Sequence, residues 1–210
     1  MSEVNIARRR LQSRDLQTAS NMETTPEQLR DLSDHDDFQV RKAVASHPNT
    51  PPEVLKDLLP YHTQAVMNNP VLPLLRLENP TVVHDWVNAS HPDGDVELDR
   101  KSSLANTTYP EILNALAHSG QLHGVHGALL HNEYLPTEAI SKLAEYPFID
   151  LHNQIVFHPN TSKKTLMKLA SQDQLGHIRS QVKERLDAGD YKEESKSMYK
   201  NMKCILEELK

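Results

Sequence analysis

The sequence predicts an all-α protein built from about six to seven short helical repeats, and three observations support this prediction. The stretch Ser46-His47-Pro48-Asn49-Thr50 returns in part as His158-Pro159-Asn160-Thr161. A proline stands near the start of successive repeats, at positions 26, 52, 110 and 136, with Lys163 at the same place in the last copy. The intervals are 26, 58, 26 and 27 residues, and 58 corresponds to about two repeats. Helices this short are not stable alone in water, so they must pack against their neighbours.

The repeated stretch has the composition of a helix start. We expect the Thr50 hydroxyl to accept a hydrogen bond from an unpaired backbone N–H, while Glu53 reaches back to the Thr50 N–H, as in a capping box. Pro51 and Pro52 fall in the first turn, where the missing N–H costs nothing. Apolar side chains then recur at helical spacing until Pro60 ends the helix.

Each repeat is expected to contain two helices joined by a short link. In the first repeat, residues 24–32 hold the first helix, and Asp36-Asp37 cap a second helix that runs to the break at His47-Pro48. The second repeat starts at Thr50 and ends at Asn68-Asn69-Pro70, which we interpret as a modified copy of the earlier break.

The pattern is weaker in the middle of the chain. Residues 70–75 have the pattern of a helix start, and residues 83–89, which include Trp86, that of a second helix. Ser90-His91-Pro92 resembles a further break, but too few residues follow it for a full repeat. We therefore expect residues 92–103 to be an irregular connection, a common place for a binding function.

The repeat returns in the second half of the chain. Thr108-Tyr109-Pro110-Glu111 restores the capping box, and the second helix of that repeat is expected to end at Leu130. The next copy keeps Pro136 but lacks the threonine, and its second helix includes Ile155-Val156-Phe157. The sixth copy ends near Val182.

These patterns divide the chain into three parts. Residues 1–15 are an arginine-rich arm or a leading helix that caps the array. Residues 16–186 form the solenoid, with an irregular segment at 70–103. Residues 187–210 have apolar side chains at helical intervals, which predicts an amphipathic helix that caps the last repeat or binds a partner or a second copy.

Residues 40–55, Val-Arg-Lys-Ala-Val-Ala-Ser-His-Pro-Asn-Thr-Pro-Pro-Glu-Val-Leu, resemble the variant leucine-rich repeat family. Its repeat reads Val-Arg-x-x-Val-Ala-x-His/Asn-Pro, then Asn/Asp-Thr-Pro and a leucine-rich helix. The resemblance covers about residues 16–185 and is weakest between 70 and 103. It implies a right-handed α-α superhelix related in shape to HEAT arrays. One member of that family holds an iron–sulfur centre in an N-terminal cysteine cluster; this chain has no cysteine in that region, so that cofactor is not expected.

Composition argues against several classes of protein. The single cysteine, Cys204, leaves no intrachain disulfide and no all-cysteine metal site. The net charge of −6 gives the chain as a whole no electrostatic reason to bind nucleic acid or an acidic membrane. No apolar run approaches the length of a transmembrane helix, and the N-terminus lacks the apolar region of a signal peptide. The expected location is the reducing cytoplasm.

The sequence contains no convincing catalytic motif. It lacks a nucleophile elbow, a phosphate-binding glycine loop and a His-Glu-x-x-His motif, so we expect a protein that is not an enzyme. His123 and His126 have the spacing of metal ligands on a helix, but no acidic or cysteine partner lies at ligand spacing beside them. His47, His91 and His158 precede the break prolines, where a histidine can bind backbone groups at a helix end. No cofactor is expected.

The leading hypothesis is a non-enzymatic module, monomeric or homodimeric, that binds a protein or peptide on the face of a short solenoid. The residues expected to contribute are Arg41, Lys42, Trp86, Arg100, Lys101 and Arg179. An alternative is a nucleic-acid-binding or alkylated-base repair protein of HEAT-like fold, which requires a basic stripe built from the five cationic residues of this set. A second alternative is a protein that binds a metal ion through histidines.

Overall fold

The computed structural model describes residues 3–90, 94–119, 123–173, 176 and 178–192. Within these residues the chain is all-α, with fourteen helices and one isolated bridge between Ser162 and Lys192. The contacts between neighbouring helices are those of a helical repeat array, which confirms the fold class expected from the sequence. The chain divides into two compact units, Met1–Leu104 and Ala105–Lys210.

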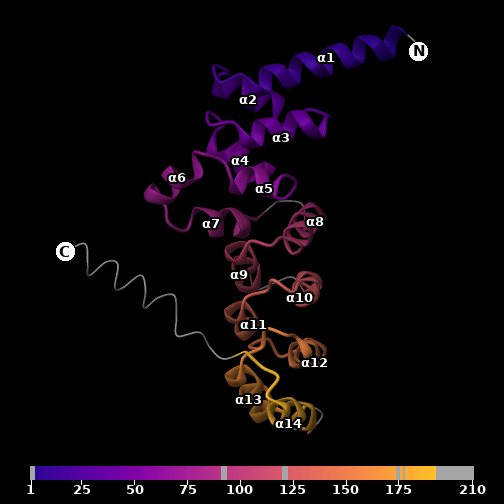
Figure 1. Ribbon diagram of the computed structural model, residues 1–210, viewed down its shortest axis with the longest axis vertical. Coiled ribbons are helices and arrows are strands. Elements are labelled where there is room, and N and C mark those ends of the chain that lie inside the picture. The colour runs from indigo at the N-terminus through magenta and orange to yellow at the C-terminus, as the bar shows by residue number, and fades with distance from the viewer. Residues whose placement is uncertain (1–2, 91–93, 120–122, 174–175, 177, 193–210) are drawn as a thin grey trace, which may run out of the picture. The chain divides into compact units, whose positions relative to one another are not determined.

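The first unit begins with paired helices (Figure 1). α1 (Glu3–Ser20) packs against α3 (Phe38–Ser46), and α3 packs against α5 (Thr63–Met67). α2 (Pro26–Leu32) contacts α1 and α3, while α4 (Pro52–Leu58) contacts α3 and α5. The first two repeats therefore consist of two helices joined by a short link, as expected.

The rest of the first unit contains α6 (Leu72–Glu78), α7 (Val82–Asn88) and α8 (Gly94–Leu104). The expected irregular connection at residues 92–103 is wrong, because α8 occupies most of it. This helix is difficult to recognise because most of its residues are polar, and its buried positions include the charged Lys101 beside Leu104. The break expected at His91-Pro92 lies outside the described residues.

The second unit contains two rows of helices. α9 lies beside α11, α10 lies beside α12, and α13 packs on α14. Their bounds are α9 (Pro110–His118), α10 (His123–Leu130), α11 (Thr137–Leu143), α12 (Ile149–Phe157), α13 (Lys163–Gln172) and α14 (Arg179–Ala188). The second helices expected to end at Leu130 and to include Ile155 are thus confirmed.

The core of both units is aliphatic and follows the repeat. The residue three positions after each repeat's marker, whether proline or Lys163, is fully buried: Leu29, Leu55, Leu113, Ala139 and Leu166. A fully buried leucine contributes about 1.5–3 kcal/mol to folding. Because each first helix has only seven to ten residues, these contacts with neighbouring helices are what keep it folded.

Histidines at the breaks bind the backbone on both sides. The ring of His47 accepts a hydrogen bond at Nδ1 from the Asn49 N–H (3.0 Å) and donates from Nε2 to the carbonyl of Asn21 in the preceding repeat (2.8 Å). These neighbours assign the neutral Nε2–H form of the ring. His158 makes the same pair of bonds, with the Asn160 N–H (3.1 Å) and the Asn132 carbonyl (3.1 Å). The expected role of these two histidines at helix ends is confirmed.

Asparagine does the same task at two other breaks. Asn69 accepts a hydrogen bond from the Val71 N–H (2.9 Å) and donates to the carbonyls of Ala45 (2.8 Å) and His47 (3.0 Å). Asn132 accepts from the Tyr134 N–H and donates to the carbonyls of Ala105 and Thr107. The interpretation of Asn69-Pro70 as a modified His47-Pro48 is confirmed. We call His47, Asn69, Asn132 and His158 the break residues.

The threonine of the repeated stretch caps the preceding helix instead of starting the next one. The hydroxyl of Thr50 donates to the carbonyl of Val44 in α3 (2.6 Å), and that of Thr161 donates to Ile155 in α12 (2.6 Å). The capping box expected at Thr50 and Glu53 is therefore wrong: α4 begins after Pro51 with no side-chain cap. The physical reason is that a proline follows the break, so the last carbonyls of α3 need a side-chain donor.

The second expected capping box, at Thr108, is also wrong, because the N-cap of α9 is Tyr109 and makes no side-chain hydrogen bond. At the end of the described chain, the Lys192 N–H donates to the Thr161 carbonyl (3.0 Å) and the Lys192 carbonyl accepts from the Lys163 N–H (3.3 Å). Residues 190–192 are therefore not helical. The rest of the expected C-terminal amphipathic helix lies outside the described residues.

The break residues should contribute strongly to stability. Replacing Asn69 by alanine leaves two buried carbonyls and one N–H without their partner, which we expect to lower the free energy of unfolding by about 1–3 kcal/mol. Asn68→Ala, at the exposed neighbouring position, is the control and should change it by less than about 0.5 kcal/mol. Urea denaturation followed by circular dichroism measures both; equal effects would contradict the role assigned to Asn69.

Stability should fall in acid through His158. Burial is the main cause that lowers the pKa of His158, and the nearby Arg185 guanidinium lowers it further. The hydrogen bond to the Asn132 carbonyl raises this pKa, but by less than burial lowers it. A pKa below the unfolded value of about 6.5 means that the stabilising contribution is present above that pH and is lost as the pH falls below it. His158→Asn, which copies Asn132, should keep the fold and lose less thermal stability than the unmodified protein between pH 7 and pH 5. An unchanged pH dependence would contradict this account.

Candidate interaction surfaces

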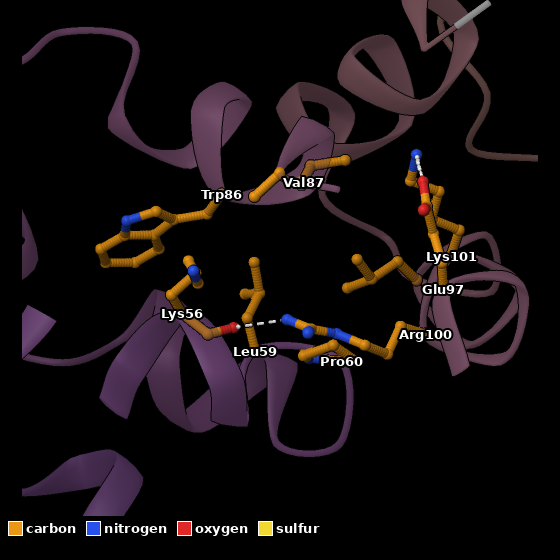
Figure 2. A pocket seen from close by; sticks show the side chains of 10 residues that line it. Lys56, Leu59, Pro60, Trp86, Val87, Glu97, Arg100 and Lys101 are labelled. Carbon is orange, nitrogen blue, oxygen red and sulfur yellow. Dashed lines mark hydrogen bonds and ion pairs between the residues drawn. The ribbon is translucent and has the colours of Figure 1, made fainter. Parts of the chain in front are cut away.

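Three residues singled out from the sequence lie around one pocket of the first unit. Trp86 of α7 and Arg100 and Lys101 of α8 line it together with α4 (Figure 2). Its volume is about 10 Å³, which is the space of about one water molecule. Figure 2 shows Trp86 and Lys101 at opposite ends of the pocket. The pocket itself is too small for a ligand.

The two cations at this pocket contact the protein itself. Lys101 Nζ lies 2.7 Å from Glu97 Oε1 in the preceding turn of α8, and the Lys101 side chain is only 7% exposed. Arg100 Nη2 donates to the Lys56 carbonyl at 3.4 Å and lies 3.8 Å from Asp57 Oδ1. The Arg100 contacts attach α8 to α4, whereas the Lys101–Glu97 pair lies within α8, so both positive charges serve the structure of the unit.

The other predicted cations have separate surroundings. Arg41 Nη1 donates to the carbonyls of His35 (2.5 Å) and Asp36 (3.0 Å), in the link between α2 and α3. Lys42 is exposed on α3. Arg179, in the second unit, donates from Nη2 to the Asp173 carbonyl (2.7 Å). The structure thus groups Trp86, Arg100 and Lys101 around one pocket. Arg41 lines a separate groove between α2 and α4, which is described below.

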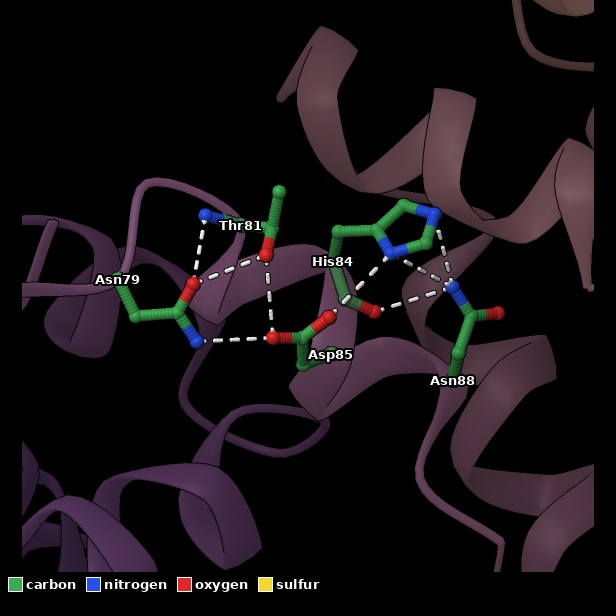
Figure 3. A network of polar contacts seen from close by, with 5 residues as sticks. All are labelled: Asn79, Thr81, His84, Asp85 and Asn88. Atoms are coloured by element: carbon green, nitrogen blue, oxygen red, sulfur yellow. Dashed lines mark hydrogen bonds and ion pairs between the residues drawn. The ribbon is translucent and has the colours of Figure 1, made fainter.

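A polar network surrounds the start of α7 (Figure 3). Asn79 accepts the Thr81 N–H at its Oδ1 (3.0 Å), and its Nδ2 donates to Asp85 Oδ2 (2.8 Å). The hydroxyl of Thr81 lies within 3.2 Å of the same carboxylate oxygen. The Asn79 hydrogen bond is the main cause that lowers the pKa of Asp85. A carboxylate in the first turn also interacts favourably with the helix dipole, so the network closes the N-terminal end of α7.

The buried histidines outside the breaks have aromatic neighbours. His126 is 2% exposed, and its ring stacks on Tyr146 with a centroid distance of 4.6 Å. His62 is 4% exposed beside Phe38; burial, together with Arg41 and Lys42, lowers its pKa. The side chain of His123 lies outside the described residues. Among the residues that the structure does describe, no group of three histidine, cysteine, aspartate or glutamate side chains could hold a metal ion.

The first unit has an open groove between α2 and α4, with a volume of about 460 Å³. Arg30 of α2 and Glu53 of α4 bridge it, with Nη2 and Oε1 2.5 Å apart. Tyr61, which is 56% exposed, also lines this α2–α4 groove. The remaining charged residues that line the groove are Asp34, Arg41 and Asp57.

The second unit has an open groove of about 390 Å³ between α10 and α12. It is lined by uncharged or imidazole side chains: Leu130, His131, Asn153, Gln154, Phe157, His158 and Pro159. The ring of Phe157 is 67% exposed, whereas its neighbours Ile155 and Val156 are fully buried. We call this feature the α10–α12 groove. It combines an exposed aromatic ring with side-chain amides.

Sequence reasoning did not identify Phe157, Asn153 or Gln154 as surface residues of interest. It placed Phe157 in the apolar run of a second helix together with Ile155 and Val156. Helical spacing contains the correcting signal: Leu151 and Ile155 are four residues apart and share the buried face, and Phe157 falls outside it.

Comparison with known proteins supports the repeat at the place where the sequence pattern is strongest. The family profile described as "Leucine rich repeat variant" matches residues 38–60, the stretch that contains α3, the break at His47 and α4. The resemblance noted from the sequence is thereby confirmed for this repeat. No curated protein and no solved structure matches the chain.

None of the helices in the described part of the chain combines the length and the apolar character needed to cross a bilayer.

The contact between Lys101 and Glu97 should be structural. Lys101→Ala removes a buried charged hydrogen bond from α8, and we expect it to lower the free energy of unfolding by about 1.5–3 kcal/mol. Lys42→Ala, at an exposed cation, should change it by no more than about 0.5 kcal/mol. Chemical denaturation distinguishes the two variants. Equal stability of Lys101→Ala and the unmodified protein would contradict a structural role of the Lys101–Glu97 contact.

Proposed function

We propose that the protein is a non-enzymatic interaction module that binds a protein or peptide in the open grooves of its helical repeats. The observation that carries this proposal is the ring of Phe157, which remains 67% exposed beside the α10–α12 groove. Aromatic side chains that lie next to a groove are frequent anchors of protein interfaces, because they bury a large apolar area on binding. Tyr61 has a similar place at the α2–α4 groove.

Two further observations support this proposal. The match at residues 38–60 is to a repeat family, and repeat arrays commonly bind proteins. In addition, Arg41, Arg100, Lys101 and Arg179 direct their charged groups at backbone carbonyls or at a carboxylate of their own unit. Cations engaged in this way favour protein binding over the nucleic-acid alternative, which needs basic groups free to contact phosphates. The proposal retains the cytoplasm as the location, given the single cysteine.

Affinity capture from a native lysate tests this function. The unmodified chain, Tyr61→Ala and Phe157→Ala are compared by quantitative mass spectrometry, with Tyr134→Ala as the control because Tyr134 is 54% exposed and lines neither groove. We expect the unmodified chain and Tyr134→Ala to capture at least one protein in equal amounts. The captured amount of that protein should fall about fivefold or more with one of the groove variants.

A second portion of the lysate is treated with nuclease before capture. Proteins that are lost after this treatment, or partners that are retained equally by every variant, would contradict the proposal.

A further inference from the structure

We propose that the α10–α12 groove binds an extended, uncharged peptide segment. Asn153 and Gln154 form hydrogen bonds with the main chain of this segment, and one of its apolar side chains packs on Phe157. This inference rests on the proposed function and adds the chemistry of the ligand.

The two amides have the required hydrogen-bonding capacity. Within the described residues, neither the Asn153 nor the Gln154 side chain forms a hydrogen bond, and both line the groove. A side-chain amide offers two donor hydrogens and an acceptor oxygen. It can therefore pair with both the C=O and the N–H of a peptide group, which a carboxylate or an ammonium group cannot do.

The same unit shows how such amides recognise a main chain. Asn132 Nδ2 donates to the Ala105 and Thr107 carbonyls, at 2.7 and 2.8 Å. Asn160 Nδ2 donates to the Glu133 and Leu135 carbonyls, at 2.7 and 3.0 Å. In each case one amide binds two carbonyls that are two residues apart in a link between helices. Asn153 and Gln154 offer this chemistry to a segment outside the repeat.

The position of Phe157 fits one side chain of that segment. Phe157 lies four residues after Asn153 and three after Gln154 on α12, so the three side chains share a face of the helix. The opposite wall of the groove is apolar at Leu130 of α10. A side chain that covers the exposed ring would remove apolar area from water, while the amides hold the main chain beside it.

The groove also selects against charge. Among the described residues that line it there is no aspartate, glutamate, lysine or arginine. Two imidazoles line it: His158 is neutral because its Nδ1 accepts the Asn160 N–H, and His131 has its Nδ1 2.8 Å from the Gly127 carbonyl. A charged side chain placed here would lose hydration without gaining a carboxylate, ammonium or guanidinium partner. The α2–α4 groove of the first unit differs, because acidic and basic side chains line it.

A displayed library of random eight-residue peptides, screened with the full chain, tests this inference. We expect enrichment of sequences with an uncharged core that contains an apolar residue. For a synthetic peptide of the enriched type, Asn153→Ala and Gln154→Ala should each weaken binding by about 2- to 12-fold, the effect of one lost hydrogen bond. Methylation of one main-chain nitrogen of the peptide should have an effect in the same range.

Gln172→Ala is the matched control, because Gln172 is an exposed amide at the end of α13 and does not line the groove. No enriched peptide, enrichment of charged sequences alone, or binding that is indifferent to Asn153→Ala and Gln154→Ala would overturn the inference. The proposed function would survive such a result if the lysate partner is lost with Tyr61→Ala. Conversely, if peptides are selected as expected but no lysate protein depends on Tyr61 or Phe157, the peptide-binding groove would stand and the proposed function would fail.

Discussion

A buried backbone group must have a hydrogen-bond partner, and the breaks between helices are where this protein has most difficulty supplying one. The helices end there, and a proline directly follows the break residue at three of the four breaks, so carbonyls and N–H groups of the link have no helical partners. His47 and Asn69 solve the problem in the first unit by accepting the N–H two residues ahead and donating to a carbonyl of the preceding repeat. Asn132 and His158 do so in the second. Each break residue therefore fixes the position of one repeat on the one before it.

The helix faces that point outward are free of this constraint. The residue just before each break residue is exposed in every case, and it is Ser46, Asn68, His131 or Phe157. The inward position repeats the same hydrogen bonds, whereas the outward position differs in size and polarity from one repeat to the next. A regular scaffold with variable outward positions can present a different surface at each repeat, which is how the α10–α12 groove acquires its ring and its amides.

The sequence was sufficient for the parts of the fold that depend on repetition. The period of the prolines located the first helices, and the copies of His47-Pro48 located the breaks at Asn69 and His158. The break at Asn132 was missed, because no proline follows Asn132. It was insufficient where one side chain has two local choices: the hydroxyl of Thr50 can cap the helix before it or the helix after it, and only the buried carbonyl of Val44 decides. The sequence did not predict α8, because the buried face of this helix includes the charged Lys101. It did not predict the α10–α12 groove either, because that groove forms only when two helices lie side by side.

Hydrogen exchange of the amide protons at the breaks tests the central claim most directly. Asn49, Val71 and Asn160 lie in links between helices, and Asn49 is an exposed residue, yet their N–H groups are bound by the break residues. The account predicts that these three protons exchange as slowly as the protons inside the neighbouring helices, because both are released only when the repeats separate. Exchange at the rate of an unstructured peptide would show that the break residues do not hold the repeats together.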